Sequence, residues 1–219
     1  MYRVTSVFAY PFREPVNGFT HLFGAFAALA GMVWLLNIPQ SDPAVTGSVI
    51  VYGLSMIVLY TSSAIYHLND GSDYTQLWLQ RLDHGAIYLL IAGCYTPVCI
   101  SVIHGEWRWI LLGLVWLLAL AGIIYKMLFL IKPGMFSLIY YIIMACVGLV
   151  APREVLAMIP ALATALILIS GLLFLTGAII FGFEKPNLHP KIGYHELWHL
   201  FVLAGSAFHF FAVYVCLRQ

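Results

Sequence analysis

The feature that most constrains the fold of this 219-residue chain is a series of seven apolar stretches near 20 residues long, of which the fifth is short and the sixth is long. They cover residues 17–37, 45–67, 80–102, 108–131, 135–151, 157–182 and 195–217. A helix needs about 20 apolar residues to cross the hydrocarbon core of a bilayer. Pro and Gly lie in most of the short connecting segments, where they end helices. We therefore predict an all-α membrane protein, a seven-transmembrane helix bundle that forms a single domain over residues 1–219.

The charge content supports a membrane location. Charged residues make up 9% of the chain, whereas soluble domains carry about 25%. The net charge of +1 leaves no basic patch for a nucleic acid. We expect a multi-pass protein of the cell membrane whose partners are membrane lipids, and we leave its oligomeric state open. The four cysteines are scattered through apolar stretches without a CxxC pair, which is typical of buried small side chains.

The distribution of Lys and Arg predicts the orientation, because cytoplasmic loops are enriched in both. With the N-terminus in the cytoplasm and the C-terminus outside, most of these residues fall at the cytoplasmic face. Those predicted inside are Arg3, Arg13, Arg81, Lys126, Lys132, Lys185 and Lys191, and those predicted outside are Arg108, Arg153 and Arg218.

Unusual polar residues then gather at one depth, near the cytoplasmic face. His195 and His199 are four residues apart at the start of the last span, so they share one face of a helix. His67 ends the second span and Asp83 begins the third, while Glu14 and Asn17 open the first. Polar groups at membrane depth are costly and are candidates for functional sites.

These residue types favour a metal site of the zinc kind. Three imidazoles, from His67, His195 and His199, leave one position open on a tetrahedral Zn²⁺, which is the pattern of a catalytic centre. Asp83 is then a candidate general base or a group that holds the water on the metal. Ser63 lies one helical turn before His67 and is a candidate to support the metal or its water. Zinc is the predicted cofactor, although ligand type alone leaves another divalent metal open.

Other interpretations of the same residues remain open. The histidine pair is consistent with two interfacial histidines, and Asp83 with an acidic residue in the first turn of its helix. The letters His195-Glu196-Leu197-Trp198-His199 also match the HExxH motif of soluble zinc proteases. That reading leaves His67 and Asp83 without a role. Glu196 points about 100° away from His195 on the helix, so we do not predict it as a ligand.

Several blocks together resemble the hemolysin III family, the bacterial branch of the progestin and adipoQ receptor superfamily, which includes the adiponectin receptors. The blocks are Ser63-Ala64-Ile65-Tyr66-His67, Leu82-Asp83-His84-Gly85-Ala86-Ile87-Tyr88, His195-Glu196-Leu197-Trp198-His199 and the opening segment Glu14-Pro15-Val16-Asn17-Gly18-Phe19-Thr20-His21. The resemblance covers essentially the whole chain. It implies seven helices, a cytoplasmic N-terminus and a bacterial plasma membrane. It also implies a zinc site held by His67, His195 and His199, with Asp83 and Ser63 beside it.

The resemblance implies hydrolysis of a lipid amide or ester, because the superfamily is related to alkaline ceramidases, and a role in membrane-lipid homeostasis. An acyl lipid would then be the substrate. One alternative is a non-enzymatic membrane sensor or receptor in which zinc is structural. A second alternative is a cytolytic or pore-forming protein, as the family name suggests. Against a pore, no span carries a continuous polar stripe.

Overall fold

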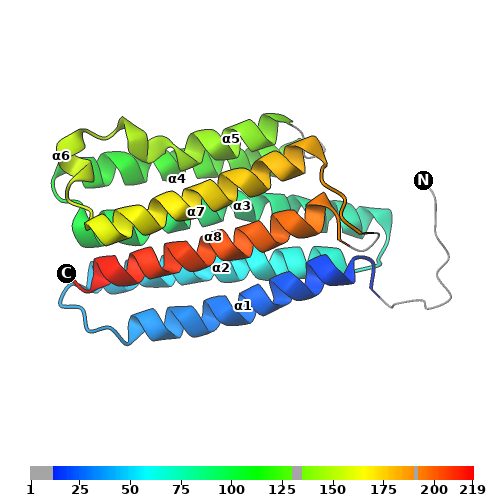
Figure 1. Ribbon diagram of the computed structural model, residues 1–219, viewed down its shortest axis with the longest axis horizontal. Coiled ribbons are helices and arrows are strands. Elements are labelled where there is room, and N and C mark those ends of the chain that lie inside the picture. The colour runs from blue at the N-terminus through cyan, green and yellow to red at the C-terminus, as the bar shows by residue number, and fades with distance from the viewer. Residues whose placement is uncertain (1–11, 130–134, 190–191) are drawn as a thin grey trace.

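The computed structural model describes residues 12–129, 135–189 and 192–219, and these residues form a bundle of long, roughly parallel and antiparallel helices (Figure 1). Six of the helices are long and apolar enough to cross a membrane. They are α1 (Pro15–Leu36), α2 (Pro43–Leu68), α3 (Asp73–Val102), α4 (Glu106–Leu128), α7 (Ala161–Phe183) and α8 (Tyr194–Leu217). In the described part of the chain, regular secondary structure is entirely helical apart from an isolated bridge between His189 and Ile192.

The fifth predicted span differs from the others. Residues 135–151 form α5 (Met135–Ala145), which is 11 residues long, and the 3-10 helix η1 (Val147–Val150). At 1.5 Å per residue, α5 is about 16 Å long, roughly half the thickness of a bilayer core. It lies along the bundle beside α4 and α7 (Figure 1). A short helix, α6 (Arg153–Leu156), then leads to α7, which begins four residues later than predicted.

The third helix begins seven residues before the predicted span. Ser72 caps it by accepting a hydrogen bond from the backbone N–H of Thr75, and Asp73 is its first-turn acid. Asp83 therefore lies in the third turn, and the alternative that it serves as the first-turn acid is wrong. The other boundaries agree with the predicted spans within a few residues, and the predicted end of the fourth span at residue 131 lies outside the described residues.

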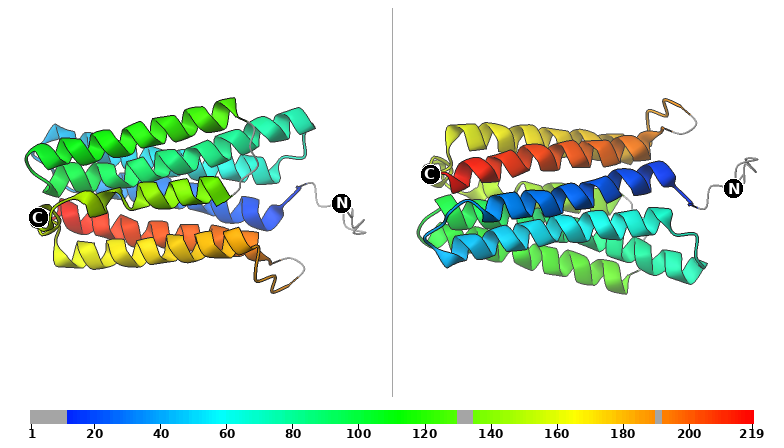
Figure 2. Two further views of the ribbon diagram at one scale, coloured as in Figure 1. Left: turned by 90° about the horizontal axis from the view of Figure 1, so that it is seen from above. Right: turned by 90° about the horizontal axis from the view of Figure 1, so that it is seen from below.

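Neighbouring helices follow the order α7, α8, α1, α2, α3 and α4 around the bundle, and α5 packs between α4 and α7 (Figure 2). Helix α3 also contacts α5 and α8, so it is the most enclosed of the six. The start of α1 and the end of α8 lie at opposite ends of the bundle. The end at which α1, α3, α5 and α8 begin and α2, α4 and α7 finish is called the site end below.

Candidate metal centre

Three imidazoles come together at the site end, from α2 and α8. His67, His195 and His199 each offer one ligand atom, and these atoms lie within 4.8 Å of one another. Their ring centroids are 4.7 to 5.0 Å apart. His195 and His199 meet because they are one turn apart on α8, and His67 reaches them from the last turn of α2. His67 and His199 are almost fully buried, while His195 is partly exposed.

Glu14 ties the start of α1 to the end of α2. Its backbone N–H donates to the carbonyl of His67 at 2.9 Å, and its Oε2 lies 2.6 Å from Nδ1 of the same residue. Pro15 follows at the first position of α1, where the missing N–H costs no helical hydrogen bond. A neutral His67 that donates Nδ1–H to Glu14 presents an unprotonated Nε2. That Nε2 is buried and has no hydrogen-bond partner in the described part of the chain, as a metal ligand requires.

The Glu14 carboxyl is held in its ionised form. Partial burial raises its pKa, but the hydrogen bond with His67 and the attraction to His67 and Arg13 outweigh burial and lower the pKa to about 2. Arg13 Nη2 lies 3.3 Å from Oε1 of Glu14. At neutral pH the carboxylate is therefore an acceptor only, and it favours the tautomer of His67 in which Nδ1 carries the proton.

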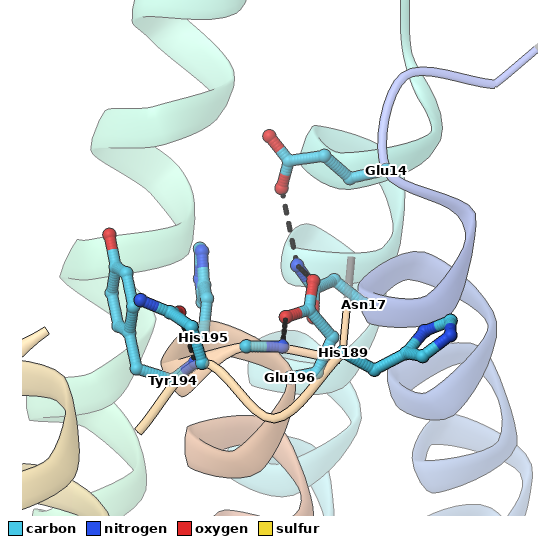
Figure 3. Close-up of a pocket in the computed structure, with 8 residues that line it drawn as sticks. Glu14, Asn17, His189, Tyr194, His195 and Glu196 are labelled. Carbon is cyan, nitrogen blue, oxygen red and sulfur yellow. Dashed lines mark hydrogen bonds between the residues drawn. The ribbon is translucent and has the colours of Figure 1, made fainter. Parts of the chain in front are cut away.

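Asn17 links this pair to the start of α8. Its Nδ2 lies 3.3 Å from Oε2 of Glu14 and donates to Oε1 of Glu196 at 3.1 Å, as Figure 3 shows. The other oxygen of Glu196 accepts a hydrogen bond of 2.8 Å from the backbone N–H of Gly193, which precedes the first residue of α8. This is the Glu half of a capping box, and it stabilises the turn that carries His195. Glu196, which we did not predict as a ligand, thus supports the helix that presents two of the histidines.

His21 forms a stack that the sequence analysis did not anticipate. It is buried on α1, and its ring lies 3.8 Å from that of His199 with the planes 24° apart. The spacing of Asn17 and His21 at i and i+4 places both on one face of α1. That spacing was visible in the sequence, but only the packing of α1 against α8 reveals what the face contacts.

Asp83 and Ser63 lie at the edge of the cluster. Both are buried, and Asp83 interacts electrostatically with Ser63 on α2, with His67 and with Glu14. The structure thus brings the predicted general base and the predicted supporting hydroxyl to the same end of the bundle as the three histidines. A carboxylate, a hydroxyl and three imidazoles from three helices can together hold a metal and accept a proton beside it.

A pocket of about 380 Å³ opens next to the cluster (Figure 3). Its lining comes from the start of α1, the segment before α8 and the first turn of α8: Glu14, Asn17, Asn187, His189, Gly193, Tyr194, His195 and Glu196. Because His195 lines the pocket and also belongs to the histidine group, a small polar molecule can approach the candidate metal position from the site end.

His84, His104 and His209 are not among the candidate metal ligands. His84 offers its carbonyl to Tyr141 Oη at 3.1 Å, and His104 lies 3.2 Å from Arg108 at the far end of the bundle. His209 is buried about three turns beyond His199 on α8. Within the described residues, the group of metal-type ligands identified is His67, His195 and His199.

The sequence of the chain is similar to known proteins along nearly its whole length. The model of the family described as Haemolysin-III related matches residues 9–210. The chain is 37% identical to Hemolysin-3 of Bacillus cereus over 203 residues, which cover 91% of this chain and 90% of that protein. It is 32% identical to the Hemolysin-3 homolog of Bacillus subtilis, over 94% of this chain and 95% of the relative.

A more distant similarity extends to animals. The chain is 24% identical to the monocyte to macrophage differentiation factor of Homo sapiens over 214 residues, which cover 93% of this chain and 84% of that protein. The match runs along nearly the whole length of both chains, so the bacterial and animal proteins share the region that contains α1 to α8.

Proposed function

The chain belongs to the hemolysin III family and is a multi-pass bacterial membrane protein, and from this premise we propose that it is a zinc-dependent hydrolase of lipid amide or ester bonds. The observation that carries the proposal is the group of three imidazoles with ligand atoms within 4.8 Å of one another. Three neutral nitrogen ligands leave a position for substrate or water on Zn²⁺, whereas structural zinc sites have four protein ligands.

The residues around the candidate metal position fit a zinc ion. His67 Nε2 is buried and unpartnered among the described residues, while Nδ1 of the same ring is held by the Glu14 carboxylate. A carboxylate on the outer nitrogen of a histidine ligand fixes the ring and raises its basicity. His195 and His199 would complete the set, and the stacked His21 ring restricts the motion of His199.

Each polar residue near the candidate metal position would have a separate role in the reaction. Bound zinc would supply Lewis acidity, which polarises a carbonyl and makes water acidic near neutral pH. Asp83 would accept the proton of the attacking water and pass it to the leaving amine or alcohol. Ser63 would orient Asp83 from the neighbouring turn of α2, and Glu14 would hold His67 in place. An acyl chain would lie among the apolar side chains of the bundle.

We also propose that the site end faces the cytoplasm and that α5 with η1 makes the seventh crossing. The described basic residues Arg13, Arg81, Lys126 and Lys185 lie towards the site end, and Arg108, Arg153 and Arg218 lie towards the other. This distribution favours a cytoplasmic site end. A hydrolase placed there would act on lipids of the inner leaflet and contribute to membrane-lipid homeostasis.

Metal content is the first test of the proposal. Elemental mass spectrometry of the detergent-purified protein should find about one zinc per chain. His67→Ala and His195→Ala should both lose it, because they remove ligands from different helices. His104→Ala is the matched control, since His104 is exposed at the other end of the bundle. A wild-type protein without metal, or variants that keep it, would overturn the zinc site.

Turnover is the second test, and it separates the hydrolase from the two other functions. The zinc-loaded protein should release fatty acid from a panel of N-acyl and O-acyl lipids, and Asp83→Asn should keep zinc and lose the release. Bound zinc without turnover on any amide or ester would favour a sensor or receptor with structural zinc. Dye leakage from liposomes that contain the pure protein would instead favour the pore, a possibility suggested by the name Hemolysin-3 of the Bacillus cereus relative.

A further inference from the structure

A second set of polar side chains lies deeper in the bundle than the histidine cluster. These residues come from α1, α2 and α8, each is more than nine-tenths buried, and we call them the internal polar chain: His21, Tyr52, Tyr60, Ser206 and His209. Tyr52 Oη and His209 Nδ1 have no hydrogen-bond partner in the described part of the chain, whereas Tyr60 lies within hydrogen-bonding reach of Ser206 and His21 within reach of the backbone of His199. A pair of hydroxyls still leaves one proton unused, and an imidazole with one partner leaves its second nitrogen unused. None of these groups binds the metal or transfers a proton in the proposed hydrolysis, and His21 contributes to it only through its stack on His199.

The internal polar chain is continuous with the candidate metal centre. His21 stacks on His199 at 3.8 Å, and its ring centroid is 5.1 Å from that of Tyr60. Tyr60 lies next to Ser206 and interacts with Tyr52.

The far end of the internal polar chain lies deep in the bundle. The Tyr52 ring centroid is 5.5 Å from that of His209. His199 and His209 are ten residues apart on α8, or about 15 Å along the helix. The set thus extends from the site end to about the middle of a bilayer core that is about 30 Å thick.

The location of these groups makes unpartnered polar atoms unfavourable. Lipid tails offer no hydrogen bonds, and a buried polar group without a partner loses the hydration it had in water. Tyr52 Oη, His209 Nδ1, the second nitrogen of His21 and the unused proton of the Tyr60–Ser206 pair therefore require a partner that is not a side chain. Hydroxyl groups and neutral imidazoles both donate and accept, and the set contains neither an acid nor an amine. A small neutral molecule that donates and accepts hydrogen bonds, which is water, matches these requirements.

We propose that the internal polar chain binds a file of ordered water molecules that leads from the histidine cluster to the middle of the bundle. The waters bridge α1, α2 and α8 and give the cluster a second contact with water, separate from the pocket at the site end. This inference concerns hydration and does not depend on zinc or on hydrolysis. If the water file is absent, the proposed hydrolase function still stands. If the hydrolase function is wrong, the water file still stands.

Radiolytic hydroxyl-radical labelling of the full chain in nanodiscs tests the proposal, because radicals formed from bound water modify the side chains that touch that water. Tyr52 and Tyr60 should be modified several-fold faster than Tyr88. Tyr88 is the matched control, since it is equally buried but lies beside the polar groups of Tyr141 and Ser137. Equal modification rates at the three tyrosines would show that the internal polar chain binds no water, and this result would overturn the proposal.

Removal of single tyrosine hydroxyls provides a second test, in which the unfolding temperature separates a hydrated path from a dry one. If water bridges the tyrosines, Tyr52→Phe and Tyr60→Phe break hydrogen bonds and lower the unfolding temperature. If the path is dry, Tyr52→Phe removes an unpartnered hydroxyl and raises the unfolding temperature, whereas Tyr60→Phe still breaks the contact with Ser206. Tyr74→Phe is the control, because this exposed ring at the site end should leave the unfolding temperature unchanged. An increase in the unfolding temperature for Tyr52→Phe would contradict the proposal.

Discussion

At the scale of single residues, Glu14 connects the first helix to the histidine cluster, and we expect its charge to matter more than its shape. Glu14→Gln keeps an oxygen near His67 Nδ1 but removes the ionised acceptor 2.6 Å away. Loss of a carboxylate behind a histidine ligand costs about 10- to 100-fold in metal affinity. We therefore predict a zinc affinity lower by that factor, measured by competition with a chelator in detergent.

The control for Glu14→Gln is Glu106→Gln. Glu106 is also at the start of a transmembrane helix, but it is exposed and lies at the other end of the bundle. Its substitution should leave the zinc affinity unchanged. An unchanged affinity in Glu14→Gln itself would show that the contact with His67 is not used to position a ligand.

Lys126 is a residue whose burial is unfavourable for stability. It lies in the last turn of α4 with 2% exposure, and its Nζ has no hydrogen-bond partner among the described residues. A buried ammonium without a counter-charge is destabilising, and a flexible apolar side chain of similar size fills the same space. We predict that Lys126→Met increases the stability by about 1–3 kcal/mol. Thermal unfolding in detergent would measure it, with the exposed Lys185→Met as a neutral control.

The candidate site could be predicted only in part from single residues. His195 and His199 share a face because of their spacing, and His67 ends a span at the same depth, so a histidine group was predictable. The contact of Glu14 with His67 and the stack of His21 on His199 depend on how α1 packs between α2 and α8. No helical period in the sequence encodes that packing.

At the scale of helices, close packing of α2 against α3 depends on a glycine. A Cβ atom placed on Gly93 would lie 2.6 Å from the Cβ of Ser55, which is attached directly to the backbone of α2. The clash cannot be relieved by rotating a side chain, so the two helices would have to separate. We predict that Gly93→Ala destabilises the protein by about 1–3 kcal/mol, the usual cost of overpacking. Chemical or thermal unfolding in detergent would measure the change.

Gly113→Ala on α4 is the matched comparison. A Cβ atom at Gly113 meets nothing within 4 Å. In a helix, Ala is favoured over Gly by roughly 0.5–1 kcal/mol, so this variant should be as stable as the wild type or more so. If both alanine variants are equally stable, close approach of α2 and α3 at Gly93 contributes nothing to stability.

The helix boundaries show where hydropathy is informative and where it is not. Hydropathy located the lipid-sized part of α3 but missed its first two turns, because Asp73 and Gln76 make that segment too polar for a span. Ser72 followed by Asp73 is a helix-start signal that would have found the true beginning. The break between α5 and η1, by contrast, has no signal in the sequence. Residues 142–151 are apolar on both sides of the break, and the first proline, Pro152, comes only after η1.

At the scale of the whole molecule, the site end joins two parts of the bundle. Helices α1 to α4 pack extensively on one another in sequence order, and α7 packs extensively on α8. Helix α8 meets α1 and α3 over much smaller contacts. The described contacts that cross this boundary at the site end are polar: Asn17 with Glu196, the stack of His21 on His199, and His67 beside both histidines of α8.

A metal held by His67, His195 and His199 would therefore fasten α8 to α2 across the weaker boundary, and its removal should lower the stability of the whole bundle. A ligand at about 1,000 times its Kd stabilises the folded state by about 4 kcal/mol. We predict that a strong chelator lowers the unfolding temperature of the wild type to that of His195→Ala and leaves His195→Ala itself unchanged. Hydrogen exchange should then increase first in the opening turns of α8 and α1. If the chelator affects the wild type and His195→Ala alike, or neither of them, the metal does not join these two parts of the bundle.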